Sequence, residues 1–128
     1  MANRWLTTGA VLAGLGVAAG AFGTHALAGR VSAELLEVFA TGTRYHLLHA
    51  VALLVVGLAG ERRTESRLWN AAGWLFTVGI LIFAGSLYAL SLSGARWLGA
   101  VTPIGGLCFL AGWSAVAAAA VRSGRSGA

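Results

Sequence analysis

The chain has 128 residues, of which 58% are hydrophobic and only 10% are charged. A soluble domain normally carries about 25% charged residues. With a mean hydropathy of +0.79, this chain lacks the side chains for a water-facing surface. The basic residues are nine scattered arginines, with no basic stripe, so the sequence excludes neither membrane nor protein partners but disfavours nucleic acid. Cys108 is the only cysteine, which rules out an intrachain disulfide and a cysteine-based metal cluster.

Four apolar stretches predict four transmembrane helices, at residues 5–27, 44–60, 69–92 and 97–121. About 20 residues of helix cross a hydrocarbon core of about 30 Å. A helix also satisfies its own backbone hydrogen bonds in lipid. The expected fold is therefore all-α, an integral membrane four-helix bundle. It forms a single membrane domain over residues 1–122, with a disordered tail at 123–128.

The first stretch allows a second interpretation, because residues 1–28 have a basic start, an apolar run and the triplet Ala26-Leu27-Ala28. This pattern is typical of a cleavable signal peptide. The alternative, which we favour, is an uncleaved first span in an alanine-rich chain.

The segment at residues 32–42 differs from the spans, since its apolar and polar residues alternate at helical spacing. Ser32 is placed to cap its start, and Glu34 falls in the first turn, where a carboxylate is favourable. We expect a short amphipathic helix that lies at the membrane interface between the first two spans.

The second span contains histidines. The uncharged apolar run from Ala50 to Gly60 has 11 residues, or about 16 Å of helix, which is too short to cross a bilayer. A spanning helix must therefore include the preceding residues, with His46 and His49, which are predicted to enter the membrane or its interface.

The arginines predict the orientation of the bundle. With four crossings, one side holds Arg4, Arg62, Arg63, Arg67, Arg122 and Arg125, and the other holds Arg30, Arg44 and Arg96. Cytoplasmic loops carry an excess of basic residues. We therefore expect a multi-pass protein of the cell (inner) membrane with both termini in the cytoplasm.

Glycine is abundant, at 19 residues, and much of it lies inside the predicted spans. Small residues let helices approach closely in lipid. The glycines expected to pack helices together are Gly16, Gly20, Gly23, Gly85, Gly105 and Gly106. A role of these glycines as hinges is the alternative.

A candidate polar cluster is expected at the non-cytoplasmic face of the bundle. Its members are His25, Arg44, Tyr45, His46, His49 and Tyr88. His46 and His49 share a helical face, and His25 can approach either from the neighbouring helix. Polar groups within a span usually face the interior and find a partner there.

Three hypotheses compete for this cluster. A metal or haem site can use His25, His46 and His49, although no cysteine or aspartate joins them. A proton or ion pathway can use the same histidines with Glu34 or Glu37. Interhelical hydrogen bonding is the interpretation that we favour, so no cofactor is predicted.

No sequence pattern indicates catalysis. Ser86 has no Gly-x-Ser-x-Gly context, the chain has no aspartate for a Ser/His/Asp triad, and no phosphate-binding loop follows a predicted strand. The expectation is a protein that is not an enzyme.

Four segments carry a family resemblance: GAFGTHAL (20–27), LLEVFATGTRYHLLHAVALL (35–54), FAGSLYAL (83–90) and TPIGGLCFLAGW (102–113). In this order they resemble domain-of-unknown-function family 423, small bacterial membrane proteins that are similar to eukaryotic transmembrane protein 256. The chain departs from the family pattern at Thr24 and Ala40. The resemblance implies that the first helix is kept as a span, and it implies no activity.

Taken together, these features favour a structural or accessory subunit of a membrane assembly, with the lipid bilayer and other membrane subunits, or further copies of itself, as partners. A small proton, ion or solute transporter that uses the polar cluster is the first alternative. A cofactor- or metal-binding membrane subunit is the second.

Overall fold

The computed structural model describes residues 3–61 and 66–127, and this part of the chain is helical with no strand. Four stretches are long and apolar enough to cross a membrane: Arg4–Leu27, Ala33–Gly60, Arg67–Ser93 and Arg96–Ser126. The loop that contains Arg62 and Arg63 lies outside the described residues. The predicted all-α fold with four membrane spans is confirmed.

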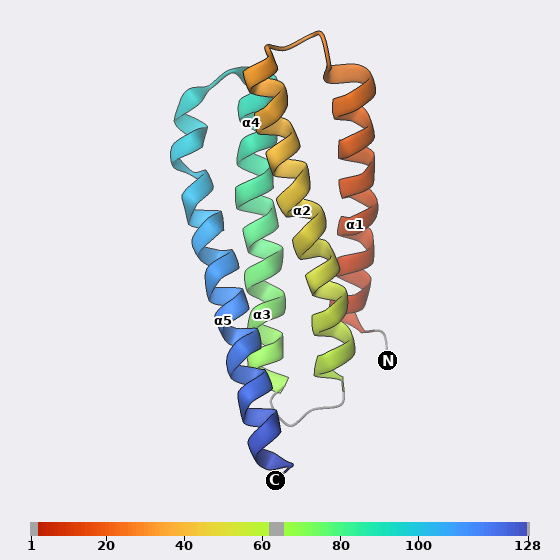
Figure 1. Ribbon diagram of the computed structural model, residues 1–128, viewed down its shortest axis with the longest axis vertical. Coiled ribbons are helices and arrows are strands. Elements are labelled where there is room, and N and C mark those ends of the chain that lie inside the picture. Colours follow the sequence, from red (N-terminus) through yellow and green to blue (C-terminus); the bar gives the residue numbers. More distant parts are fainter. Residues whose placement is uncertain (1–2, 62–65, 128) are drawn as a thin grey trace.

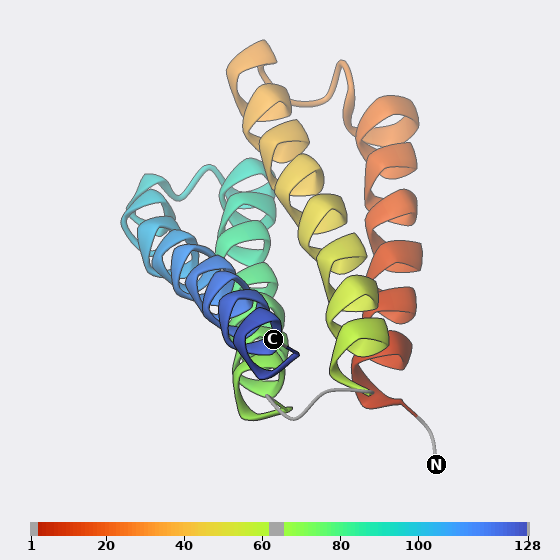
Figure 2. The same cartoon turned by 60° about the horizontal axis from the view of Figure 1, so that its bottom comes forward.

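The spans form an up-and-down bundle (Figure 1). The first is α1 (Arg4–Phe22) with a π-helical turn (Gly23–Leu27), and the second is α2 (Ala33–Gly60). The third joins α3 (Ser66–Gly79), a π-helical turn (Ile80–Ala84) and α4 (Gly85–Ser93), and a 3₁₀ turn (Arg96–Ala100) precedes α5 (Thr102–Ser126). Figures 1 and 2 both show α1 beside α2 and α5 beside α3, and Figure 1 shows the two chain ends at the same end of the bundle.

Local sequence explains where the helices begin and turn. The side chains of Asn3 and Ser32 cap α1 and α2 by accepting hydrogen bonds from the backbone N–H groups of Leu6 and Leu35, each at 3.2 Å. The predicted cap at Ser32 is thus confirmed. Gly94 follows α4 with φ of 71°, a left-handed conformation that favours glycine at a helix end.

The interfacial helix predicted at residues 32–42 is not a separate element. The structure continues it into the second span as the single helix α2 of 28 residues. No proline interrupts the segment, and the buried hydroxyl of Thr43 bonds to the carbonyl of Phe39 within the helix. At 1.5 Å per residue α2 is about 42 Å long, so its first turns extend past a hydrocarbon core of about 30 Å. Glu34 and Glu37 lie in that extension, which explains its amphipathic pattern.

The tail predicted as disordered at residues 123–128 is also different in the structure. Helix α5 continues to Ser126, with Gly127 at its end, while Ala128 lies outside the described residues. The Ser126 hydroxyl bonds to the carbonyl of Arg122, one turn earlier. A helix already formed in the membrane extends over such residues because each added residue gains a backbone hydrogen bond without a new nucleation step.

The π-helical turn at Ile80–Ala84 changes the register of the third span. A π turn inserts one extra residue into an α-helix. Because of this turn, residues four apart in the sequence stay on the same face of the third span. Phe76, Ile80 and Ala84 are therefore all almost fully buried. Tyr88, the next residue in this series, reaches α2 with its hydroxyl. These side chains, with Leu53, Val56 and Phe109, belong to the core between the helices.

Candidate functional site

A layer of polar side chains crosses the middle of the bundle and is defined here by His46, His49, Tyr88 and Trp113. The two histidines follow Ala33 by 13 and 16 residues, or about 20 and 24 Å along α2. They sit three residues apart and face different neighbours, and both are at least 95% buried. This polar layer lies deep in the membrane, where each unpaired polar group is costly.

Both ring nitrogens of His46 are hydrogen bonded. Its Nε2 lies 2.8 Å from the backbone carbonyl of Leu12 on α1, and its Nδ1 lies 2.9 Å from the hydroxyl of Tyr88 on α4. A carbonyl only accepts hydrogen bonds, so Nε2 carries the hydrogen. In the neutral ring Nδ1 then accepts from the tyrosine O–H. His46 therefore joins α1, α2 and α4.

His49 has the opposite arrangement. Its Nδ1 donates to the carbonyl of Tyr45 at 2.8 Å, and its Nε2 accepts from the indole N–H of Trp113 on α5 at 3.0 Å. An indole N–H can only donate, so this bond selects the neutral ring with its hydrogen on Nδ1. The ring also stacks on Phe109, with centroids 3.6 Å apart and planes at 6°. His49 therefore joins α2 to α5.

The geometry of the polar layer suits helix packing. All four ring nitrogens of His46 and His49 have partners within the protein, which leaves no lone pair directed at an additional ligand. Within residues 3–61 and 66–127, no group of three or more His, Cys, Asp or Glu side chains lies together so that it could hold a metal ion.

The structure separates the six residues of the predicted polar cluster. His46 and Tyr88 bond to each other, while the one member of the predicted cluster that His49 contacts is Tyr45, through its backbone carbonyl and its ring. Arg44 is exposed and pairs with Glu37 at 3.5 Å. His25 is exposed at the end of the first span, far along α1 from the Leu12 carbonyl that His46 contacts. The polar layer thus leaves out His25, Arg44 and Tyr45 of the predicted cluster. It includes Trp113, which was not predicted as a member although it ends one of the four segments of the family resemblance.

The six glycines predicted to pack helices divide into two groups. An added Cβ at Gly16 would lie 2.6 Å from the Leu47 side chain, and one at Gly105 would lie 2.5 Å from the backbone nitrogen of Phe83. Gly23 is almost as close to its neighbour. Gly20 has only ordinary contacts, Gly106 almost none, and Gly85 none. Close approaches at Gly57 and Gly73 were not among the predicted positions.

Two pockets lie at opposite ends of the bundle. One, of about 570 Å³, is bordered by the end of the first span and the start of α2, with Phe39 and Thr43 in its wall. The charged residues at this pocket, Glu37 and Arg44, pair with each other.

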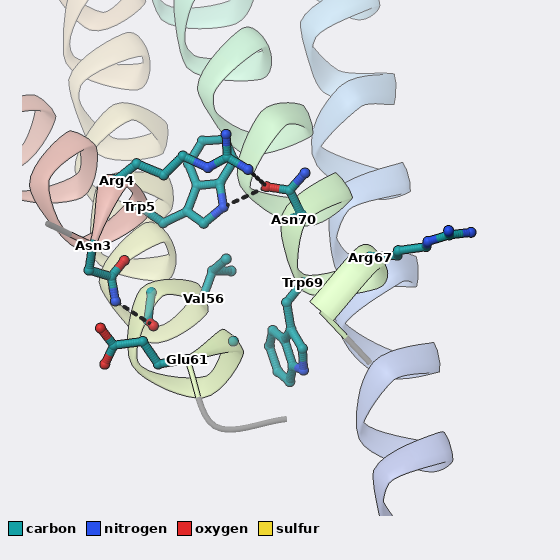
Figure 3. A pocket seen from close by; sticks show the side chains of 10 residues that line it. Asn3, Arg4, Trp5, Val56, Glu61, Arg67, Trp69 and Asn70 are labelled. Carbon is teal, nitrogen blue, oxygen red and sulfur yellow. Dashed lines mark hydrogen bonds between the residues drawn. The ribbon is translucent and has the colours of Figure 1, made fainter. Parts of the chain in front are cut away.

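The second pocket, of about 440 Å³, lies where the start of α1 meets the end of α2 and the start of α3 (Figure 3). The Asn3 amide donates to the carbonyl of Gly57 at 2.8 Å. The Asn70 amide oxygen accepts from the guanidinium of Arg4 and from the indole of Trp5. We call this the terminal pocket.

Comparison with known proteins places this architecture in a family. Residues 19–106 match the family described as "Protein of unknown function (DUF423)". The chain is 41% identical to the UPF0382 membrane protein YwdK of Bacillus subtilis over 118 residues, which cover 92% of this chain and 96% of that protein. No solved structure matches the chain.

Other relatives match a similar share of the chain. A UPF0382 membrane protein of Staphylococcus epidermidis is 44% identical over 85% of this chain and 88% of its own length. One of Haemophilus influenzae is 37% identical over 96% of this chain and 98% of its own length. These matches extend over most of the chain. The chain belongs to the DUF423 family of small membrane proteins, as the resemblance of its four segments predicted.

Proposed function

We propose that this protein is a non-enzymatic structural or accessory subunit of a membrane assembly, and that the outer face of α1 is its contact surface. The observation that carries the proposal is a ridge of small residues on that face, formed by Ala10, Gly14 and Ala18, which the bundle leaves exposed. An added Cβ at Gly14 would meet nothing within 4 Å. Small residues four apart on a lipid-facing helix are the arrangement by which membrane helices associate closely.

The first and last spans are the most exposed parts of the bundle. In the most apolar part of the first span only 17% of the residues are buried, and in the last span 22%, against 44% in each of the other two. Both spans carry large exposed side chains, among them Val11 and Val17 on α1, which are 57% and 65% exposed, and Leu107 and Leu110 on α5, each 66% exposed. Such side chains suit contact with lipid. The small ridge on α1 suits contact with another helix.

The polar layer supports a structural role. A transport path or a cofactor site needs polar groups that are free to bind a passing ion or a ligand. In this bundle three of the four ring nitrogens of His46 and His49 bond to other helices and the fourth bonds to Tyr45 within α2, and together these bonds connect all four spans. The distribution of arginines favours an orientation with both termini in the cytoplasm and a location in the cell membrane.

The test is the size and composition of the particle extracted from native membranes in a mild detergent. The wild-type protein is expected as an oligomer or with a membrane partner. Gly14→Leu should raise the dissociation constant of the assembly by about tenfold or more, since a bulky side chain in a close helix contact costs about 1–3 kcal/mol. The thermal stability of the dissociated bundle should stay unchanged because position 14 is open space.

The matched control is Ala111→Leu, which adds the same bulk to the exposed outer face of α5. It should leave the particle intact. A wild-type protein that is monomeric and without a partner in gentle detergent would exclude this function, as would assembly that survives Gly14→Leu. Ion or proton flux into liposomes by the protein alone would favour a transporter instead.

A further inference from the structure

Two opposite charges that border the terminal pocket, Arg4 and Glu61, have no charged partner among the described residues. One side of the pocket is lined by Arg4, Trp5 and Asn70, and Glu61 borders the opposite side (Figure 3). Arg67 also borders the pocket, but Figure 3 shows its side chain directed outward. Among the described residues, the charged side chains that border this pocket are thus Arg4, Glu61 and the outward-directed Arg67.

The cation is held in place without being neutralised. The guanidinium of Arg4 donates to the amide oxygen of Asn70, which is a neutral acceptor, and lies 5.1 Å from the centre of the Trp5 ring. Neither of the ion pairs in the described chain involves Arg4. In addition, α1 begins at Arg4, so the positive end of its helix dipole lies at the same point. This side of the pocket favours an anion.

The anion is in an unfavourable position for a carboxylate. Glu61 follows the last residue of α2, at the negative end of the helix dipole, where a negative charge is destabilised. Its side chain has no hydrogen bond or ion pair with any described residue, and it is exposed. A bound cation at Glu61 would remove this repulsion. The pocket therefore offers separate places for a negative and a positive group.

The walls between the two charges suit the membrane interface. Gly57 and Gly60 border the pocket without side chains, and an added Cβ would lie 2.7 Å from the Leu6 backbone nitrogen at Gly57 and 3.2 Å from the Trp69 Cβ at Gly60. The indole rings of Trp5 and Trp69 border it, and tryptophan side chains are enriched where hydrocarbon meets headgroups. A volume of about 440 Å³ is within the usual range for small-ligand sites.

We propose that the terminal pocket binds the headgroup of a zwitterionic phospholipid with a primary amine, its phosphate at Arg4 and its ammonium at Glu61. Basic pockets between membrane helices recognise anionic lipids. This pocket instead matches one negative and one positive group in a single headgroup. Its position at the end of the bundle provides direct access from the lipid. The site lies apart from the ridge on α1, so this proposal does not depend on the proposed function.

The experiment measures lipid retention by native mass spectrometry of the detergent-purified protein. Phosphatidylethanolamine and phosphatidylglycerol with identical acyl chains are offered in competition. The wild-type protein should retain the ethanolamine lipid in preference, by roughly threefold, as expected for one exposed charge interaction. Glu61→Gln should abolish this preference, and Arg4→Gln should weaken the retention of both lipids.

The matched controls are Glu37→Gln and Arg96→Gln, which change the same residue types at the other end of the bundle. Both should retain lipid as the wild type does. Glu61 forms no hydrogen bond or ion pair with any described residue, so Glu61→Gln tests the site even if Arg4→Gln unfolds at a lower temperature. A preference for phosphatidylglycerol in the wild type, or an unchanged preference in Glu61→Gln, would overturn the proposal. If millimolar glycerophosphoethanolamine displaced the bound phospholipid completely, the ligand of the pocket would be the free headgroup compound and not the lipid.

Discussion

The bond between Trp113 and His49 can be tested by a double-mutant cycle. His49→Phe keeps an aromatic ring that can stack on Phe109 but removes both ring nitrogens, and Trp113→Phe removes the donor. Each single variant leaves the other partner without its hydrogen bond inside the membrane. The double variant removes both groups at once, so it should be more stable than the sum of the two single losses predicts.

The size of this coupling follows from the surroundings of the pair. A buried polar group left without a partner costs about 1–3 kcal/mol. Measured couplings between membrane helices average about 0.6 kcal/mol and reach about 1.7. Because the bond is 3.0 Å long and His49 is only 2% exposed, we expect a value in the upper half of that range. The bond from His49 to Tyr45 is lost equally in the single and the double variant, so it cancels.

The assay is reversible unfolding of the purified protein in mixed detergent micelles, followed by circular dichroism. The control cycle pairs His46→Phe with Trp113→Phe, since His46 bonds to α1 and α4 and has no contact with the indole. This control should be additive to within about 0.5 kcal/mol. Additivity in the His49 cycle as well would refute the idea that the polar layer holds α5 to α2.

Two further predictions concern the same core. Tyr88→Phe removes the hydroxyl bonded to His46 and should lower the unfolding free energy by about 0.6–1.7 kcal/mol in the same assay; no change would contradict the bond. Gly105→Ala should destabilise the protein by about 1–3 kcal/mol, because the added methyl group meets the backbone of Phe83, whereas Gly85→Ala meets no atom and should be neutral or stabilising. If both alanine variants changed the unfolding free energy equally, the close packing at Gly105 would not be important for stability.

Simple length arguments predicted the most informative part of the fold. The apolar run from Ala50 to Gly60 is too short for a span, which required the histidines to lie inside the second helix, and α2 confirms this. The boundary placed near residue 43 was wrong, because a change from amphipathic to apolar pattern marks the depth in the membrane and not a break in the helix.

The partners within the bundle were harder to predict. In an antiparallel pair with its turn near residue 30, position 46 lies opposite position 14 and not opposite His25. The observed bond from His46 to the carbonyl of Leu12 agrees with this counting. A backbone carbonyl inside a helix leaves no mark in the sequence. The indole of Trp113 could be paired with His49 only once the rotation of α5 about its axis was known.

The π-helical turn at Ile80–Ala84 has a consequence for how this chain tolerates insertions and deletions. Because the π turn already accommodates one extra residue, removing one residue from it would restore a regular α-helix and leave the residues that follow on the same face, moved by about 1.5 Å along the axis. Removing a residue between Ala84 and Tyr88 instead would rotate Tyr88 by about 100° relative to Phe76, and its hydroxyl would then turn away from His46. A deletion inside the irregular turn is therefore expected to be tolerated better than the same deletion in the regular helix beside it.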